Sequence, residues 1–300
     1  MRIACLGVGR MGWHMAGHVA AADEAHEVVV FDVVEGLGDR WAREHRGAFA
    51  DTVAAAVDGS AFVVTSLPSD RELAEVSQEA LPALDRGAIW IDHSTTSAAI
   101  ARELGERTAA QGGHFLDGPV SGGVDGARQG TLSVMVGGDE DAFARAEPLM
   151  GTYAGRVRHM GPSGAGQLTK MTNQICVVGL CQALAEGLDF ASRAGLDVEK
   201  VVEAMLQGSS TSWQMENRAD RMLAGEYDFG FSTSLMRKDV GLVLDQASTM
   251  GVSLPVTALV GQFLADVDAM GGAAWDWCSL MERQRQFAPR DVPTAPSDYS

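Results

Sequence analysis

Lysine is scarce in this 300-residue sequence, where Lys170, Lys200 and Lys238 stand against twenty arginines. Basic residues together are outnumbered by acidic ones, which gives a formal net charge of −17 at pH 7. Nucleic acid and anionic membrane surfaces are disfavoured as partners, because both need a basic footprint on the protein. An anionic small molecule would have to be met by a few local positive groups.

Cysteine is also sparse, and long hydrophobic runs are missing. The four cysteines form no Cys-x-x-Cys pair and no Cys/His cluster with zinc-ligand spacing, so we expect buried, reduced thiols and no metal. No stretch has eighteen uninterrupted apolar residues, so no membrane-spanning segment is expected. The N-terminus lacks the basic start, apolar run and cleavage site of a signal peptide, which predicts a cytoplasmic protein.

The first half of the chain alternates short apolar runs with longer alanine-rich segments of helical periodicity, such as 11–22 and 71–83. Alternating strands and helices predict a mostly parallel, doubly wound sheet of the Rossmann type. The predicted strands lie near residues 3–6, 28–31, 61–66, 88–91, 114–116, 131–136 and 156–160.

The second half has few strand signals, and it predicts an all-α domain. A long helix over 167–193 is expected to be its centre, followed by helices over 198–206 and 240–250. Gly195 is typical of a helix terminator, and Pro255 of a helix's first turn. We therefore predict a dinucleotide-binding domain over 1–162, a helical substrate domain over 163–288, and a mobile tail over 289–300.

A glycine-rich loop follows the first predicted strand. Gly7, Gly9 and Gly12 form the pattern G-x-G-x-x-G, in which the glycines permit a tight turn, close approach of a pyrophosphate and close helix packing. The pyrophosphate would lie at the N-terminus of the next helix, near Met11. The cofactor-contacting loop is therefore predicted to comprise Gly7, Val8, Gly9, Arg10, Met11 and Gly12.

Asp32 closes the next strand, twenty positions after Gly12. A carboxylate there accepts hydrogen bonds from a ribose and repels a 2′-phosphate, and Val33 and Val34 offer no arginine to receive one. The sequence therefore favours NAD over NADP. Further loops leave the same predicted sheet edge and are expected to flank the nicotinamide, with contacts from Leu67, Pro68 and Thr95.

The segment 117–138 is unusually rich in glycine. Ser121, Gly122 and Gly123 offer one hydroxyl and successive backbone N–H groups, which suit a substrate carboxylate. A turn-rich connection between two strands explains the same composition, and the stretch alone does not decide between them.

Together the motifs resemble the β-hydroxyacid dehydrogenases, the family of 3-hydroxyisobutyrate dehydrogenase and tartronate semialdehyde reductase. The resemblance covers the chain from Arg2 to about Arg283. It is carried by the glycine loop, by DGPVSGG at 117–123, by GTL at 130–132, by GAG at 164–166 leading to Lys170 and Asn173, and by Lys238-Asp239.

The resemblance implies an enzyme that interconverts a small 3-hydroxy acid and its semialdehyde with a nicotinamide cofactor. It implies that Lys170 is catalytic, that Lys238 contacts the cofactor, and that dimers or tetramers assemble through the helical domain. The implied substrate contacts are Ser121, Gly122, Gly123 and Asn173.

The chemistry supplies a reason for lysine at position 170. Hydride transfer from an alcohol needs a group that takes the hydroxyl proton, and arginine does not release its own proton whereas a desolvated lysine does. Asn173 lies three residues on, on the same helix face, where it would orient the ammonium or the substrate. Gln174 is assigned a supporting role, and Phe231 a place near the nicotinamide.

Four alternatives stay open at this point. An NADPH-preferring semialdehyde or glyoxylate reductase of the same family would use Lys170 as the acid. Imine reductases and phosphogluconate dehydrogenases share the architecture. An imine reductase fits less well, because Lys170 suits alkoxide chemistry. Phosphogluconate dehydrogenases typically carry a much longer helical domain. A non-catalytic nucleotide sensor would be expected to lack Lys170 or Asn173. The particular hydroxy acid and the direction of reaction are not readable from the sequence.

Overall fold

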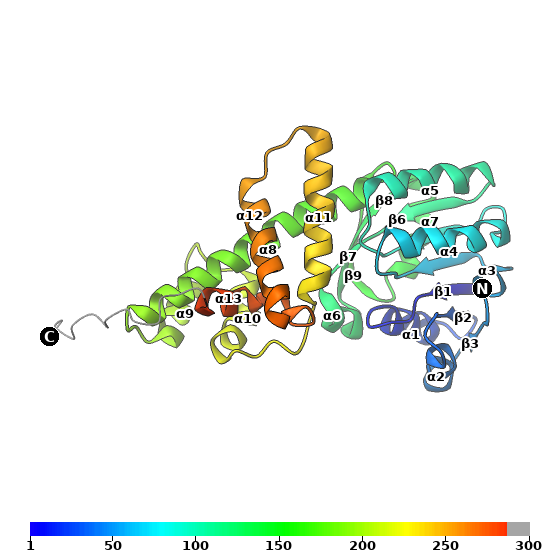
Figure 1. Ribbon diagram of the computed structural model, residues 1–300. Helices are drawn as coiled ribbons and strands as arrows, with labels where there is room; N and C mark the ends of the chain where they lie inside the picture. The colour runs from blue at the N-terminus through cyan, green and yellow to red at the C-terminus, as the bar shows by residue number, and fades with distance from the viewer. Residues whose placement is uncertain (287–300) are drawn as a thin grey trace. The chain divides into compact units, whose positions relative to one another are not determined.

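The computed structural model describes residues 1–286, so the predicted tail over 289–300 lies outside the described residues. The chain divides into two compact units, one from Met1 to Lys170 and the other beginning at Met171 (Figure 1). Helix α8 (Ala165–Arg193) starts in the first unit and continues into the second.

The first unit contains all the named strands of the described chain. They are β1 (Arg2–Leu6), β2 (Glu27–Phe31), β3 (Ala48–Phe49), β4 (Phe62–Thr65), β5 (Ile89–Asp92), β6 (His114–Asp117), β7 (Val120–Ser121), β8 (Leu132–Gly137) and β9 (Ala154–Gly161). Its helices are α1 (Gly12–Ala22), α2 (Leu37–Glu44), α3 (Val53–Val57), α4 (Asp70–Ala83), α5 (Ala98–Ala110), α6 (Gly123–Gln129) and α7 (Glu140–Met150).

These strands form one sheet in the order β3-β2-β1-β4-β5-β6-β8-β7, with β9 paired to β8. The six strands from β3 to β6 run parallel to one another, whereas β8 runs antiparallel to β6 and β7. The order reverses at β1, whose neighbours are β2 and β4. In open α/β sheets such a reversal, at the carboxyl ends of the strands, is where ligands bind. The predicted Rossmann fold with a mostly parallel sheet is confirmed.

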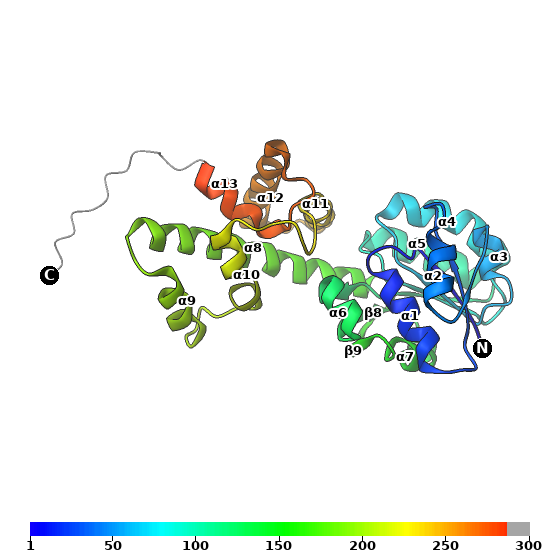
Figure 2. The same cartoon turned by 90° about the horizontal axis from the view of Figure 1, so that it is seen from below.

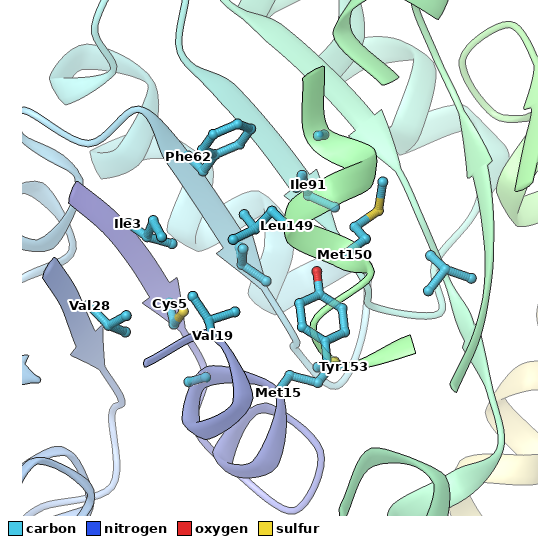
Figure 3. Packing of buried hydrophobic residues seen from close by; sticks show 14 of the residues in the cluster. Ile3, Cys5, Met15, Val19, Val28, Phe62, Ile91, Leu149, Met150 and Tyr153 are labelled. Carbon is cyan, nitrogen blue, oxygen red and sulfur yellow. The ribbon is translucent and has the colours of Figure 1, made fainter. Parts of the chain in front are cut away.

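Successive strand residues point to opposite faces, and each face has its own core. In β1, Ile3 and Cys5 join a cluster with α1 and α7, while Ala4 and Leu6 join one with α3, α4 and α5. Figure 2 shows α1, α6 and α7 on one side of the sheet and α3, α4 and α5 on the other. Figure 3 shows the first cluster, where side chains of α1, β1 and α7 meet near the buried Tyr153.

The described residues of the second unit form helices and their connecting loops, and the later part of α8 organises them. Val178, Cys181, Ala185 and Leu188 lie on one stripe of α8 and are buried in the helical core. The other helices are α9 (Val198–Leu206), α10 (Trp213–Ala224), α11 (Thr233–Met250), α12 (Pro255–Val267) and α13 (Leu280–Gln286), with short helical turns at Asp268–Gly272 and Trp277–Ser279. Pro255 begins α12 as expected, and Gly195 follows the end of α8 with a φ of +73°.

Several details differ from the sequence predictions. The short strands β3 and β7 were not predicted, because two residues give no alternation to detect. Cys176 is exposed instead of buried, because it lies off the buried stripe of α8. Helix α11 begins at Thr233, seven residues earlier than predicted, with Ser232 as its cap. Within residues 1–286 one helix, α8, is long and apolar enough to cross a membrane, but its apolar stripe belongs to the helical core.

Helix α8 offers a matched pair of glycines for a stability test. A Cβ at Gly166 would lie 2.3 Å from the Asp117 carbonyl oxygen and 2.4 Å from that of Met135, whereas at Gly187 nothing lies within 4 Å. We expect Gly166→Ala to lower the free energy of unfolding by roughly 1–3 kcal/mol through overpacking. Gly187→Ala should raise it by about 0.5–1 kcal/mol through reduced chain entropy. Denaturant unfolding of both variants checks this, and equal effects would contradict the packing described.

Candidate functional site

The glycine loop connects β1 to α1 in a geometry that only glycine allows at two positions. Gly7 has a φ of +87°, and a Cβ there would lie 2.5 Å from the Ser66 carbonyl oxygen. A Cβ at Gly12 would lie 1.9 Å from the Gly7 carbonyl oxygen. A Cβ at Gly9, by contrast, would meet nothing within 4 Å, so this face of the backbone is open to a ligand. Helix α1 has neither a side-chain cap nor an acidic residue in its first turn.

Asp32 follows β2 and holds this loop. Its Oδ2 accepts a hydrogen bond from Val8 N–H at 2.8 Å, and its Oδ1 accepts one from Val34 N–H at 2.9 Å. A carboxylate has about four acceptor positions, so two bonds leave capacity for ribose hydroxyls. The next two residues are the exposed valines Val33 (86%) and Val34 (58%). Neither position supplies an arginine beside Asp32. Asp32 thus has a structural role that the sequence did not predict.

The loops after β4 and β5 leave the same sheet edge, because β4 pairs in parallel with β1 and β5 pairs in parallel with β4. The two loops are joined by Ser94, whose Oγ accepts a hydrogen bond from Leu67 N–H at 2.8 Å. Pro68 is exposed, and Leu67 and Thr95 are half-buried. The structure therefore brings three predicted cofactor loops to one edge of the sheet.

The candidate substrate residues lie on a neighbouring part of the sheet. Ser121 is on β7 and pairs with Ser133 of β8, and Gly122 and Gly123 lead into α6. Gly122 and Gly123 are exposed, with φ values of +127° and +63°. The segment is thus both a turn-rich connection and an accessible row of backbone N–H groups.

Asp117 ends β6, and its carboxylate holds the segment that starts α8. Its Oδ1 accepts from Gly164 N–H at 2.7 Å and its Oδ2 from Gln167 N–H at 2.9 Å. A Cβ at Gly137 would lie 2.5 Å from Oδ1, and one at Gly166 would lie 2.9 Å from Oδ2. The glycines of this region thus make room for one buried carboxylate.

Three titratable groups are buried together at this edge. Burial raises the pKa of Asp92 to about 7 and that of Asp117 to about 6. Asp92 Oδ1 accepts from Thr65 Oγ1 at 2.7 Å and from Ser94 Oγ at 2.6 Å. Burial lowers the pKa of His93 to about 4, so its ring is neutral between Gly118 O at 2.5 Å and Tyr153 Oη at 2.8 Å. None of the three was singled out from the sequence, since burial decides their importance.

Lys170 lies in the second turn of α8 and is only 8% exposed. The other lysines differ in setting. Lys200 is an exposed residue of α9 whose Nζ lies 2.6 Å from Asp197 Oδ2, so its charge lies at the surface. Lys238 lies in the second turn of α11, and its Nζ lies 2.9 Å from Oδ1 of the buried Asp239.

Asn173 belongs to the second unit, where its amide is part of a side-chain network. Asn173 Nδ2 donates to Gln174 Oε1 at 2.9 Å, and Gln174 Nε2 donates to Asp239 Oδ2 at 2.6 Å. Asp239 therefore links Gln174 to Lys238. The supporting role expected of Gln174 has this geometric basis, whereas Asp239 was noted only as part of a motif.

The aromatic candidate Phe231 has contacts within the second unit. Phe231 is half-buried and packs against the helical core, and its N–H donates to Asp276 Oδ2 at 3.0 Å. Trp213, at the start of α10, is 52% exposed, and Arg218 lies 4.7 Å from its ring centroid. Among the described residues, no group of three or more His, Cys, Asp or Glu side chains is placed to hold a metal ion.

The strand order, the glycine loop and the converging edge loops define a Rossmann-type dinucleotide-binding protein with a helical second domain. Two family models match consecutive parts of the chain. The NAD binding domain of 6-phosphogluconate dehydrogenase matches residues 2–161, and the NAD-binding domain of NADP-dependent 3-hydroxyisobutyrate dehydrogenase matches residues 164–283.

Similar proteins cover nearly the whole chain. A 3-hydroxyisobutyrate dehydrogenase of Pseudomonas aeruginosa is 35% identical over 96% of this chain and 99% of its own length. A 2-hydroxy-3-oxopropionate reductase of Escherichia coli is 32% identical over 94% of this chain and 96% of its own. The solved 3-hydroxyisobutyrate dehydrogenase of Mycobacterium tuberculosis has a TM-score of 0.88 at 30% identity, covering 95% of this chain and 99% of its own. The chain belongs to the β-hydroxyacid dehydrogenase family, as its motifs indicated.

The buried Asp92 gives the folded protein a pH dependence that can be measured. Its folded pKa of about 7 lies above the ordinary value of 3.8 for an aspartate, so the folded state binds the proton more tightly. Stability from this group is present at low pH and is lost as pH rises from about 4 to about 7, at up to about 1.4 kcal/mol per pH unit. Asp92→Asn lacks this titration. The free energy of unfolding of wild type minus that of the variant should therefore fall across this window. Parallel pH curves would contradict it.

Proposed function

We propose that this protein is an NAD-dependent oxidoreductase that interconverts a small 3-hydroxy acid and its semialdehyde, with Lys170 as general acid and base. The observation that carries the proposal is the buried Lys170 on α8, in a chain that otherwise uses arginine for most of its positive charge. Desolvation lowers the cost of losing an ammonium proton, and a group that titrates is what alcohol oxidation needs.

The cofactor's place is supported by the fit of the glycine loop. Gly9 is open, α1 begins without an acidic residue, and the Val8 N–H is fixed by Asp32. The pyrophosphate would lie over Gly7–Gly12, and Leu67, Pro68 and Thr95 would border the nicotinamide. When bound, the nicotinamide supplies the hydride acceptor or donor. Phe231 and Lys238 are proposed as further cofactor contacts.

The substrate's place follows from the polar groups left for a carboxylate. Ser121 Oγ and the backbone N–H groups of Gly122 and Gly123 would bind it. Lys170 would accept the proton of the C3 hydroxyl during oxidation and return it during reduction, while Asn173, three residues along α8, orients the same hydroxyl. The Mycobacterium tuberculosis structure contains L-serine, a small carboxylate with a hydroxyl at C3, which supports this substrate class.

An NADPH-preferring semialdehyde reductase is the second candidate. The similarity to a 2-hydroxy-3-oxopropionate reductase favours it, as does the family description that mentions NADP. Asp32, with no arginine at positions 33 and 34, is the observation that favours NAD. The domain boundaries near residue 162, the homodimer or homotetramer and the cytoplasmic location stand as further parts of the proposal.

Replacement of Lys170 tests the acid/base role. We expect Lys170→Ala to lower kcat by roughly 10²–10⁴-fold, because the hydroxyl proton loses its acceptor. NADH binding, followed by fluorescence titration, should stay within a few-fold of wild type. Lys170→Arg should be as inactive, since arginine keeps its proton. Lys200→Ala is the matched control and should keep wild-type turnover of 3-hydroxyisobutyrate. Near-normal turnover by Lys170→Ala would refute the assignment.

Cofactor preference tests Asp32. Asp32→Asn removes the charge that repels a 2′-phosphate, so kcat/KM with NADP⁺ should rise while that with NAD⁺ falls. Asp39→Asn, in the first turn of α2, is the control and should leave the ratio unchanged. Initial rates with both cofactors measure it, and a wild-type preference for NADP⁺ would replace the first candidate with the second.

A further inference from the structure

The side chain of Gln167 connects two parts of the first unit that the proposed function uses separately. Gln167 is the third residue of α8 and is completely buried. Its Nε2 donates to the Ser94 carbonyl oxygen at 2.8 Å, and its Oε1 accepts from the Thr96 N–H at 3.1 Å. The amide thus pairs with the backbone on both sides of Thr95, the proposed nicotinamide contact.

The same loop is fixed to the neighbouring cofactor loop. Ser94, whose carbonyl receives the Gln167 amide, also accepts the Leu67 N–H on its Oγ at 2.8 Å. That hydroxyl donates to Asp92 Oδ1 at 2.6 Å. Leu67 and Thr95 are therefore held by one continuous set of buried hydrogen bonds that ends at Gln167.

The backbone of Gln167 is fixed from the opposite side. Asp117 Oδ2 accepts its N–H at 2.9 Å, and Oδ1 accepts the Gly164 N–H at 2.7 Å. The position of the first turn of α8 is therefore fixed relative to β6 and to the loop after β5. Lys170 follows three residues later on the same face of this helix, so displacement of the first turn displaces Lys170.

We propose that Gln167 is a positioning residue that sets the spacing between the cofactor loops and Lys170, through its paired hydrogen bonds to Ser94 and Thr96. This role rests on the proposed function. It differs from the general need to satisfy a buried amide, as Gln182 on the same helix shows. Gln182 is 5% exposed, its Nε2 bonds only to Glu186 one turn away, and its Oε1 has no partner.

The test compares Gln167→Met with Gln182→Met, since methionine has nearly the shape of glutamine but cannot make these bonds. The substrate is 3-hydroxyisobutyrate with NAD⁺. We expect kcat and the single-turnover rate of NADH formation to fall tenfold to a hundredfold for Gln167→Met, as for a shift of about 1 Å between reacting groups. KM for the hydroxy acid and Kd for NADH should change by less than about threefold. Gln182→Met should keep the wild-type kcat per folded molecule.

A second readout does not depend on turnover. Amide hydrogen exchange at Thr96 should accelerate in Gln167→Met, because its acceptor is gone, and should not change in Gln182→Met. Gln167→Glu is the second variant should Gln167→Met fail to fold. It keeps an acceptor for Thr96, but its carboxylate, when ionised, has no donor for the Ser94 carbonyl oxygen, so its kcat should lie between those of wild type and Gln167→Met.

The two ways of failing are distinguishable. Wild type that turns over no 3-hydroxy acid, or Lys170→Ala that keeps normal turnover, overturns the proposed function and the role of Gln167 with it. The second outcome is that wild type is active, Lys170→Ala is inactive and Gln167→Met keeps the wild-type kcat per folded molecule. That outcome overturns only the role of Gln167. Unchanged Thr96 exchange would also overturn it, whatever the turnover.

Discussion

The buried carboxylate of Asp117 is the constraint to which much of the first unit is fitted. It accepts backbone N–H groups from the segment that begins α8, at a point where helix N-termini have unsatisfied donors and favour negative charge. These bonds set the orientation of the first turn of α8 relative to β6. Helix α8 then continues into the second unit. Burial raises the pKa of Asp117 to about 6, and these backbone bonds oppose that rise.

Polar residues buried at the carboxyl edge of the sheet hold the loops that follow the strands. Thr65 and Ser94 both donate to Asp92, and the Ser94 hydroxyl in turn accepts the Leu67 N–H. Buried polar groups are tolerated when they are hydrogen-bonded, and a set that is largely satisfied makes a loop rigid. Loops that would otherwise be mobile are thereby given fixed positions beside the glycine loop.

Much of the fold was predictable because its signals are local. The strands at 3–6 and 114–116, and the helix at 198–206, were found from apolar periodicity, and the glycine loop from its spacing. The two-residue strands β3 and β7 carry no periodic signal and were missed. Asp92 and Gln167 could not be identified because their importance comes from burial and from partners more than twenty residues away. The motifs gave Lys170 and Asn173, but not the networks around them.

The glycines around Asp117 have a consequence for how this region changes in evolution. The space that side chains at Gly137 and Gly166 would occupy is filled by one carboxylate and by nearby backbone. A side chain at either position would meet backbone atoms as well as the carboxylate, so a smaller residue at 117 would not make room for it. A smaller residue at 117 would also leave backbone donors without an acceptor. The three positions are therefore expected to resist change both singly and together, so variation in this region is expected to fall on other residues.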